Sequence, residues 1–290
     1  MDRLLAVAAL TSLIHLINTL IYSVRVSGVR TGRLATAISL FNVVFLVSST
    51  ANMIQGPLLA TMVEGAIHRG GGAAAVEAMG WQMEFTESYA GQINILAGDF
   101  RLVILSATFG TILGWLLIPY FIELFSRAIL FFEKTGSISG MIYAIVFLPP
   151  HKKELILRTA ALPPEEKRGG EAIVAGFPIT FLAMNVIVTG VFTTGVISAL
   201  YAGSLYPGYR ASATMLASVV NGFAQVLFAT IVDPAAARIT DQAIRGDREE
   251  SEVRKMAFYL AGTRLAGTLL AQGLFIPAAY LVRFVAISIT

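Results

Sequence analysis

The chain alternates between long apolar stretches and short segments that hold its charges. Stretches without Asp, Glu, Lys or Arg cover residues 4–24, 34–63, 102–122, 172–209, 211–232 and 265–282. A helix rises about 1.5 Å per residue, so about 20 apolar residues are needed to cross a hydrocarbon core about 30 Å thick. The runs are continuous, unlike the alternating pattern of a membrane β-strand. The pattern therefore predicts six spanning helices, at residues 4–23, 34–59, 102–125, 172–200, 211–232 and 257–282.

Composition agrees with an all-α polytopic membrane protein. The 290 residues are 56% hydrophobic and 13% charged, whereas a soluble domain has about 25% charged residues. The net charge of +3 arises from few charged residues and does not indicate a nucleic-acid-binding face. The absence of cysteine excludes disulfides, thiolate metal sites and a cysteine nucleophile.

The distribution of basic residues predicts the orientation. Fifteen of the 21 lie in the first, third and fifth connections, five lie on the opposite side, and Arg264 lies within a span. By the positive-inside rule, the odd connections are cytoplasmic and both termini are outside. Residues 138–148 are apolar but too short to span, and Pro149-Pro150 follow them, so an interfacial or re-entrant segment is expected.

These spans form one membrane domain of two three-helix units. The first unit is 1–148, with an outside loop at 60–101. Residues 149–171 form a cytoplasmic linker, and the second unit is 172–290. Within the outside loop, the aromatic residues Trp81, Phe85 and Tyr89 recur at four-residue steps, which predicts a helix lying in the membrane interface.

The two units repeat the same order of motifs. Gly110-Thr111-Ile112-Leu113 precedes Ile118-Pro119 in the third span, and Gly267-Thr268-Leu269-Leu270 precedes Ile276-Pro277 in the sixth. The second and fifth spans share a longer order: Arg33, Ser39, Asn42, Pro57 and Glu64 against Arg210, Ser218, Asn221, Pro234 and Asp241. Because these spans cross in opposite directions, the order predicts a 3+3 inverted-topology repeat, as in many alternating-access carriers. Coincidence among helices rich in Gly, Ile, Leu and Pro is the alternative.

Five of the six spans carry polar side chains at helical spacing. They are His15, Asn18, Thr19 and Tyr22; Asn42, Ser49, Asn52 and Gln55; Asn185, Thr189 and Thr193; Ser218, Asn221 and Gln225; and Arg264, Thr268 and Gln272. Polar groups are costly in hydrocarbon, so together they predict a shared hydrophilic cavity. Hydrogen bonds between helices, at about 0.6 kcal/mol each, are the alternative interpretation.

Charged and titratable groups near these stripes are candidates for anion binding. Arg25, Arg30 and Arg33 follow the His15 stripe, and guanidinium groups bind phosphate through paired N–H donors, although these arginines also serve as topological signals. If the sixth helix starts near residue 257, Arg264 lies about 10 Å inside it and either snorkels or faces an anion. His15 is either a proton relay or a packed residue. No catalytic or metal-binding residue is predicted.

Residues 15–57 resemble the opening of the Amj family. The residues that carry this resemblance are His15-Leu-Ile-Asn-Thr-Leu-Ile-Tyr22-Ser-Val-Arg25-Val-Ser-Gly28-Val-Arg30-Thr31, Ser39-Leu-Phe-Asn42 and Ser49-Thr-Ala-Asn52-Met-Ile-Gln55-Gly-Pro57. The chain length and Asp233-Pro234 after the fifth span also fit. Members of the family are bacterial lipid II flippases, alternates to the MurJ flippase and unrelated to it in sequence.

The resemblance implies that the chain moves undecaprenyl-diphosphate-linked disaccharide-pentapeptide (lipid II) from the inner to the outer leaflet of the bacterial cytoplasmic membrane. On this interpretation Arg25 and Arg30 capture the diphosphate and Arg264 is the inner charge partner. Asn42, Asn52, Gln55, Asn221 and Gln225 line the path, and His15, Asn18 and Arg33 are further candidates for binding the substrate. The implied partners are lipid II, membrane lipids and peptidoglycan-synthesis proteins, with no nucleic acid and no cofactor.

Two alternatives remain. One is a transporter of another lipid-linked oligosaccharide, and the other is an intramembrane enzyme acting on a polyprenyl phosphate. Such an enzyme needs clustered acids, histidines or metal ligands. The predicted span interiors contain no acid, and His15 is their only histidine, which argues against the enzyme.

Overall fold

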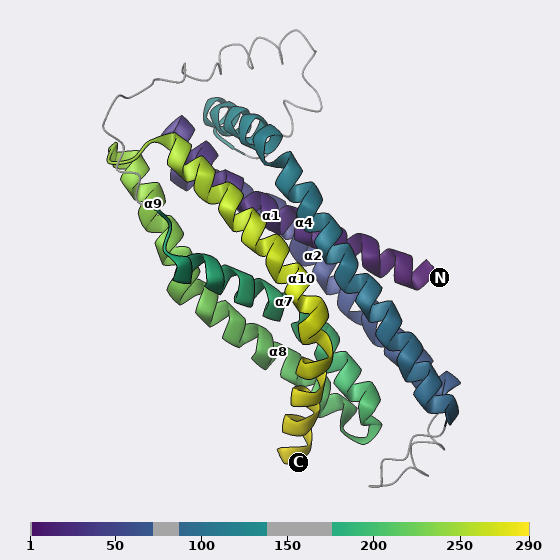
Figure 1. Ribbon diagram of the computed structural model, residues 1–290. Helices are drawn as coiled ribbons and strands as arrows, with labels where there is room; N and C mark the ends of the chain where they lie inside the picture. The colour runs from purple at the N-terminus through teal and green to yellow at the C-terminus, as the bar shows by residue number, and fades with distance from the viewer. Residues whose placement is uncertain (1, 72–86, 138–175, 290) are drawn as a thin grey trace, which may run out of the picture.

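A computed structural model of the chain describes residues 2–71, 87–137 and 176–289 (Figure 1). Within these ranges the secondary structure is helical, and no strand is present. The helices are α1 (Asp2–Thr31), α2 (Leu34–Arg69), α4 (Glu87–Thr135), α7 (Ile179–Leu205), η1 (Pro207–Tyr209), α8 (Arg210–Leu227), η2 (Phe228–Val232), α9 (Asp233–Arg245) and α10 (Glu250–Ser288). The described part contains six helices long and apolar enough to cross a membrane, counting the continuous run from η1 to α9 as one. The prediction of an all-α protein with six apolar helices is confirmed.

The helices run further than the apolar stretches that predicted them. α2 continues to Arg69 and α4 begins at Glu87, so both ends of the expected loop 60–101 are helical. α10 begins at Glu250 instead of near residue 257. Charges bounded the predicted spans, but a charged side chain is compatible with a helix that has left the hydrocarbon core, and acids in a first turn complement the helix dipole. The segments 138–148 and 149–171 lie outside the described residues.

Ion pairs and hydrogen bonds join different helices toward two opposite ends of the bundle. At the first, which we call the Arg30 end, Arg30 of α1 contacts Glu123 of α4 and Glu250 of α10. At the second, the Arg101 end, Arg101 of α4 donates to the carbonyl O of Gln272 in α10. Figure 1 shows α10 running from the top of the view to the C-terminus at the bottom, with α4 crossing beside it in the opposite direction. α4 and α10 therefore run side by side in opposite directions through the bundle.

Glycines let the helices of each three-helix group approach closely. α1 packs most extensively against α4, and α7 against α10. A Cβ added to Gly114 of α4 would lie 2.7 Å from Cβ of Thr19 in α1, and one added to Gly267 of α10 would lie 2.6 Å from Cβ of Thr189 in α7. Small residues at such crossings are the usual basis of helix association in membranes. The next most extensive pairs are α1 with α2 and α7 with α8, so both groups pack in the same order.

The Arg101 end is packed around aromatic side chains from three helices. Phe100 of α4 lies edge-to-face on Tyr201 of α7 and Phe275 of α10, with ring centroids 6.4 and 6.1 Å apart. Tyr89 is fully buried beside them and donates its hydroxyl to the carbonyl O of Ser204 at 2.8 Å. Tyr89 therefore does not lie in an exposed interfacial belt as its spacing suggested. The other two aromatics of that predicted stripe, Trp81 and Phe85, lie outside the described residues.

Candidate functional site

The three arginines predicted to capture an anion each contact a carboxylate at the Arg30 end. Arg25 of α1 pairs with Asp233 of α9. Arg30 pairs with Glu250 of α10 at 2.8 Å and with Glu123 of α4 at 3.4 Å. Arg33, just before α2, pairs with Glu133 of α4.

None of these acids was predicted as a site residue, although the Asp233-Pro234 motif was noted after the fifth span. Asp233 and Glu250 lie 208 and 220 residues away from their arginines along the chain, so no local spacing connects them. Their pairs join α1 to α9 and α10 and therefore link the two three-helix groups. The side chains of Arg25 and Arg30 are mostly buried, 19% and 17% exposed. The arrangement holds two guanidinium groups at the boundary between the groups, where each is neutralised by a carboxylate.

A second pair of cationic or titratable groups lies deep in the bundle. His15 is at the middle of α1 and is 8% exposed, and its Nδ1 has no hydrogen-bond partner among the described residues. The Nε of Arg264 in α10 is likewise buried and without a partner in that part of the chain. Because α10 begins at Glu250, Arg264 lies about 21 Å along its helix instead of the 10 Å expected, and the added turns carry charged residues that precede the apolar stretch.

Hydrogen bonds beside Arg264 connect α1, α7 and α10. The hydroxyl of Tyr22 donates to Oδ1 of Asn185 at 3.2 Å. Nδ2 of Asn185 in turn donates to the carbonyl O of Leu260 at 2.9 Å and to Oγ1 of Thr263 at 2.8 Å. Tyr22 and Asn185, members of two of the predicted stripes, are thus brought together with α10 beside Arg264.

Other predicted path residues make local contacts between α1 and α2. Nε2 of Gln55 donates to Oγ1 of Thr11 at 2.5 Å, and Oδ1 of Asn18 accepts from Oγ of Ser48 at 3.3 Å. Such bonds act as interhelical contacts within the first group. For Gln55 and Asn18, the alternative interpretation of the polar stripes therefore applies: they form hydrogen bonds between helices.

The remaining path residues lie on less buried surfaces of α2 and α8. Asn42, Asn52 and Gln225 are exposed, while Asn221 is partly exposed. Oδ1 of Asn221 is buried without a partner among the described residues and faces the backbone of Gly195, where an added Cβ would lie 2.2 Å away. The α2 stripe, expected close to one face, is divided, because Gln55 points into the bundle and Asn42 and Asn52 point out of it.

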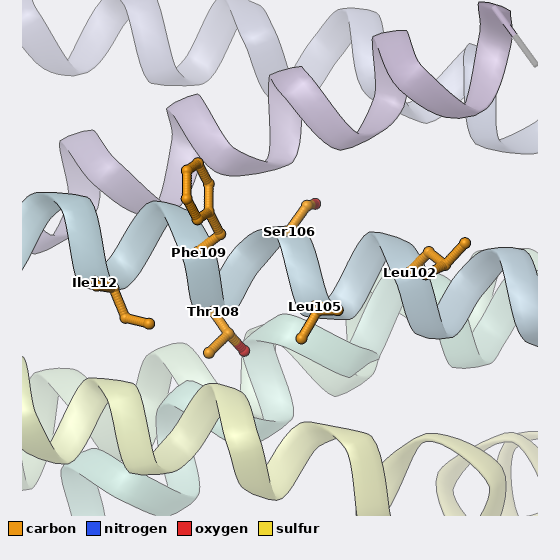
Figure 2. Close-up of a pocket in the computed structure, with 6 residues that line it drawn as sticks. All are labelled: Leu102, Leu105, Ser106, Thr108, Phe109 and Ile112. Atoms are coloured by element: carbon orange, nitrogen blue, oxygen red, sulfur yellow. The ribbon is translucent and has the colours of Figure 1, made fainter.

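A separate, apolar trough of about 420 Å³ lies on the outer surface of α4 (Figure 2). Leu105, Thr108 and Ile112 project on the side of α10, and Ser106 and Phe109 on the side of α1. Leu102, Leu105 and Phe109 are more than half exposed. The trough can hold a hydrocarbon chain, whereas a phosphate would be unsolvated there. Among the described residues, no group of three or more His, Asp and Glu side chains is placed to hold a metal ion.

Comparison with known proteins identifies relatives along nearly the whole chain. The family model Amj, described as "Alternate to MurJ", matches residues 10–286. A protein of Bacillus subtilis (strain 168) named "Lipid II flippase Amj" is 35% identical over 275 residues, which cover 92% of this chain and 91% of the relative. No solved structure matches the chain. The resemblance seen at residues 15–57 is confirmed and extends to both three-helix groups.

Proposed function

The chain belongs to the Amj family, and we propose that it is a lipid II flippase of the bacterial cytoplasmic membrane, a transporter and not an enzyme. The observation that carries this proposal is the 35% identity to the lipid II flippase over 92% of the chain. The proposed direction is from the inner to the outer leaflet. Peptidoglycan-synthesis proteins, which make and consume the lipid, are the proposed neighbours.

We propose a 3+3 inverted-topology repeat with both termini outside. The shared packing order of the two groups supports the repeat, as does the close approach of Gly114 to Thr19 and of Gly267 to Thr189. The 15-to-5 bias of basic residues supports a cytoplasmic Arg30 end. The Arg101 end then faces outside.

The substrate requires both a polar path and access to lipid. A lipid-linked diphosphate carries about two negative charges and cannot cross hydrocarbon unaided. In the proposed path, Arg25, Arg30 and Arg33 receive the diphosphate at the cytoplasmic end, and His15 and Arg264 meet it halfway. The unpartnered His15 Nδ1 and Arg264 Nε support this second position, because buried polar atoms usually have a partner.

The other residues of the proposed path are polar but uncharged. Asn42, Asn52, Asn221 and Gln225 offer amide groups on α2 and α8, while Gln55 and Asn18 hold α1 against α2. The isoprenoid tail remains in lipid, where the trough on α4 is one apolar surface available to it. The membrane potential assists the outward step by about 2.3 kcal/mol per charge per 100 mV, so roughly 5 kcal/mol for two charges.

Complementation tests the proposal. Cells depleted of their resident lipid II flippase should survive on the wild-type chain, and purified protein in vesicles should expose labelled lipid II in the outer leaflet without releasing phosphate. The Arg25→Ala and Arg264→Ala variants should lose at least 10-fold in initial flipping rate at equal expression. Arg127→Ala is the matched control, because Arg127 pairs with Glu123 on its own helix and is more than half exposed.

Each contrary result has a distinct meaning. Phosphate release would indicate the enzyme alternative. Transport of another lipid-linked oligosaccharide in preference to lipid II would change the proposed substrate. Full activity of the Arg25 and Arg264 variants would remove these residues from the path.

A further inference from the structure

Asp233 stands at a joint in the fifth span, where the regular helix is interrupted. α8 ends at Leu227, a π-helical turn covers Phe228–Val232, and α9 begins at Asp233. The backbone N–H of Asp233 donates to the carbonyl O of Phe228, five residues earlier, so Asp233 itself closes the wide turn. Pro234 follows and has no N–H to donate. Single π turns within α-helices are frequent at functional sites.

The side chain of Asp233 reaches across the boundary between the two three-helix groups. Its Oδ1 lies 2.5 Å from Nη2 of Arg25 in α1. A guanidinium group stays charged at physiological pH, so the mostly buried Arg25 needs an anion beside it. The side chain of Asp233 is 51% exposed, so it can return to water at little cost. The two partners thus differ, because the Arg25 side chain is held within the bundle, whereas the Asp233 carboxylate can be exchanged for another anion.

We propose that Asp233 is the gate residue of the transporter: its carboxylate occupies Arg25 until the diphosphate of the lipid substrate takes its place. This inference rests on the proposed function. A diphosphate carries more charge than a carboxylate and offers several oxygens for paired N–H···O contacts, so it competes well for the same guanidinium. Displacing Asp233 also breaks a link between α1 and α9, so binding of the headgroup loosens the cytoplasmic end.

The π turn supplies the movement that takes Asp233 away. If the segment returned to α-helical bonding, the amide of Asp233 would bond to the carbonyl O of Ala229 instead of Phe228. A shift of one residue turns α9 by about 100° around its axis and moves it by about 1.5 Å along it. That rotation removes the carboxylate from Arg25. α2 shows the regular alternative, because it is α-helical from Leu34 to Arg69 through Pro57, the proline that matches Pro234 in the order of motifs.

Affinity for farnesyl diphosphate, a short isoprenoid diphosphate, tests the gate in purified protein by titration calorimetry. Asp233→Asn removes the competing charge and should tighten binding about 10-fold. Arg25→Gln should weaken it about 10-fold, and Asp233→Asn added to Arg25→Gln should change it less than 2-fold. The matched control is Asp247→Asn, because Asp247 pairs with Arg245 close by in sequence and is exposed. The control should bind as wild type does.

Three results would overturn the gate. They are unchanged or weaker binding by Asp233→Asn, an equal gain in the Arg25→Gln background, and binding by neither the wild type nor Asp233→Asn. Failure of the proposed function is separate, because it would appear as wild-type protein that does not rescue depleted cells.

Movement at the π turn can be measured separately. The chain contains no cysteine, so spin labels attach only at cysteines introduced for the purpose. Spin labels at Val219→Cys in α8 and Ile244→Cys in α9, both exposed positions, report the distance across η2. Farnesyl diphosphate should shift the wild-type distance distribution, and Asp233→Asn should show the shifted distribution without ligand. An identical distance distribution in all these samples would show that the π turn does not rearrange when Asp233 separates from Arg25. That result would overturn this part of the proposal.

Discussion

The two ends of the bundle are closed by different chemistry. At the Arg101 end, the rings of Phe100, Tyr201 and Phe275 interlock across the two three-helix groups, and hydrogen bonds to backbone carbonyls accompany them. At the Arg30 end, mainly aliphatic side chains pack between the groups together with Tyr22 and Phe181, and guanidinium–carboxylate pairs of Arg25 and Arg30 complete the contact.

The difference indicates which end yields first to the substrate. Opening the Arg101 end separates buried aromatic surfaces and leaves them without partner atoms, which forfeits many dispersion contacts at once. At the Arg30 end, the ion pairs can exchange a carboxylate for a phosphate and keep their charge balance. The proposed anionic headgroup could therefore open the Arg30 end by exchange, whereas exchange at the Arg210–Glu64 pair would leave the aromatic packing of the Arg101 end in place.

Phe275→Ala should have the largest effect on folding. Phe275 is fully buried and contacts two other rings, so its truncation should cost about 3–5 kcal/mol of stability. Denaturant unfolding in detergent measures the loss. Phe284→Ala on the same helix is the control, because Phe284 is 68% exposed. Equal stability of the two variants would show that the aromatic cluster does not hold the Arg101 end closed.

Arg30→Gln should have a smaller effect on folding and a large one on transport. The substitution leaves Glu250, which is 25% exposed, without its cation, so a stability loss of about 1 kcal/mol is expected. Flipping in vesicles should fall at least 10-fold because the headgroup loses a phosphate ligand. Arg127→Gln is the control for both measurements. A loss of stability as large as that of Phe275→Ala would show that the Arg30 pairs mainly hold the fold together and are not exchangeable contacts for a phosphate.

The sequence predicted the number and type of spans because the hydrocarbon core demands apolar runs of fixed length. It could not predict the helix ends, since charges outside the core neither stop a helix nor extend it. It pointed to Arg25 and Arg30 as site residues, but not to their pairing with Asp233 and Glu250, which depends on contacts more than 200 residues apart. The outward position of Asn42 and Asn52 beside the inward Gln55 likewise depends on how α2 is rotated against α1.

Arg210→Gln should have the smallest effect and is the sharpest test of the contrast between the ends. Arg210 of α8 pairs with Glu64 of α2 at 2.8 Å, an ion pair between the groups at the Arg101 end. Both side chains are more than 40% exposed, so solvent screens the pair and its contribution should be below about 1 kcal/mol. If aromatic packing closes this end, neither unfolding in detergent nor flipping at low and high salt should change measurably. A marked, salt-dependent loss would mean that both ends are held by exchangeable charges, and the chemical difference between them would no longer support the proposed entry of the headgroup at the Arg30 end.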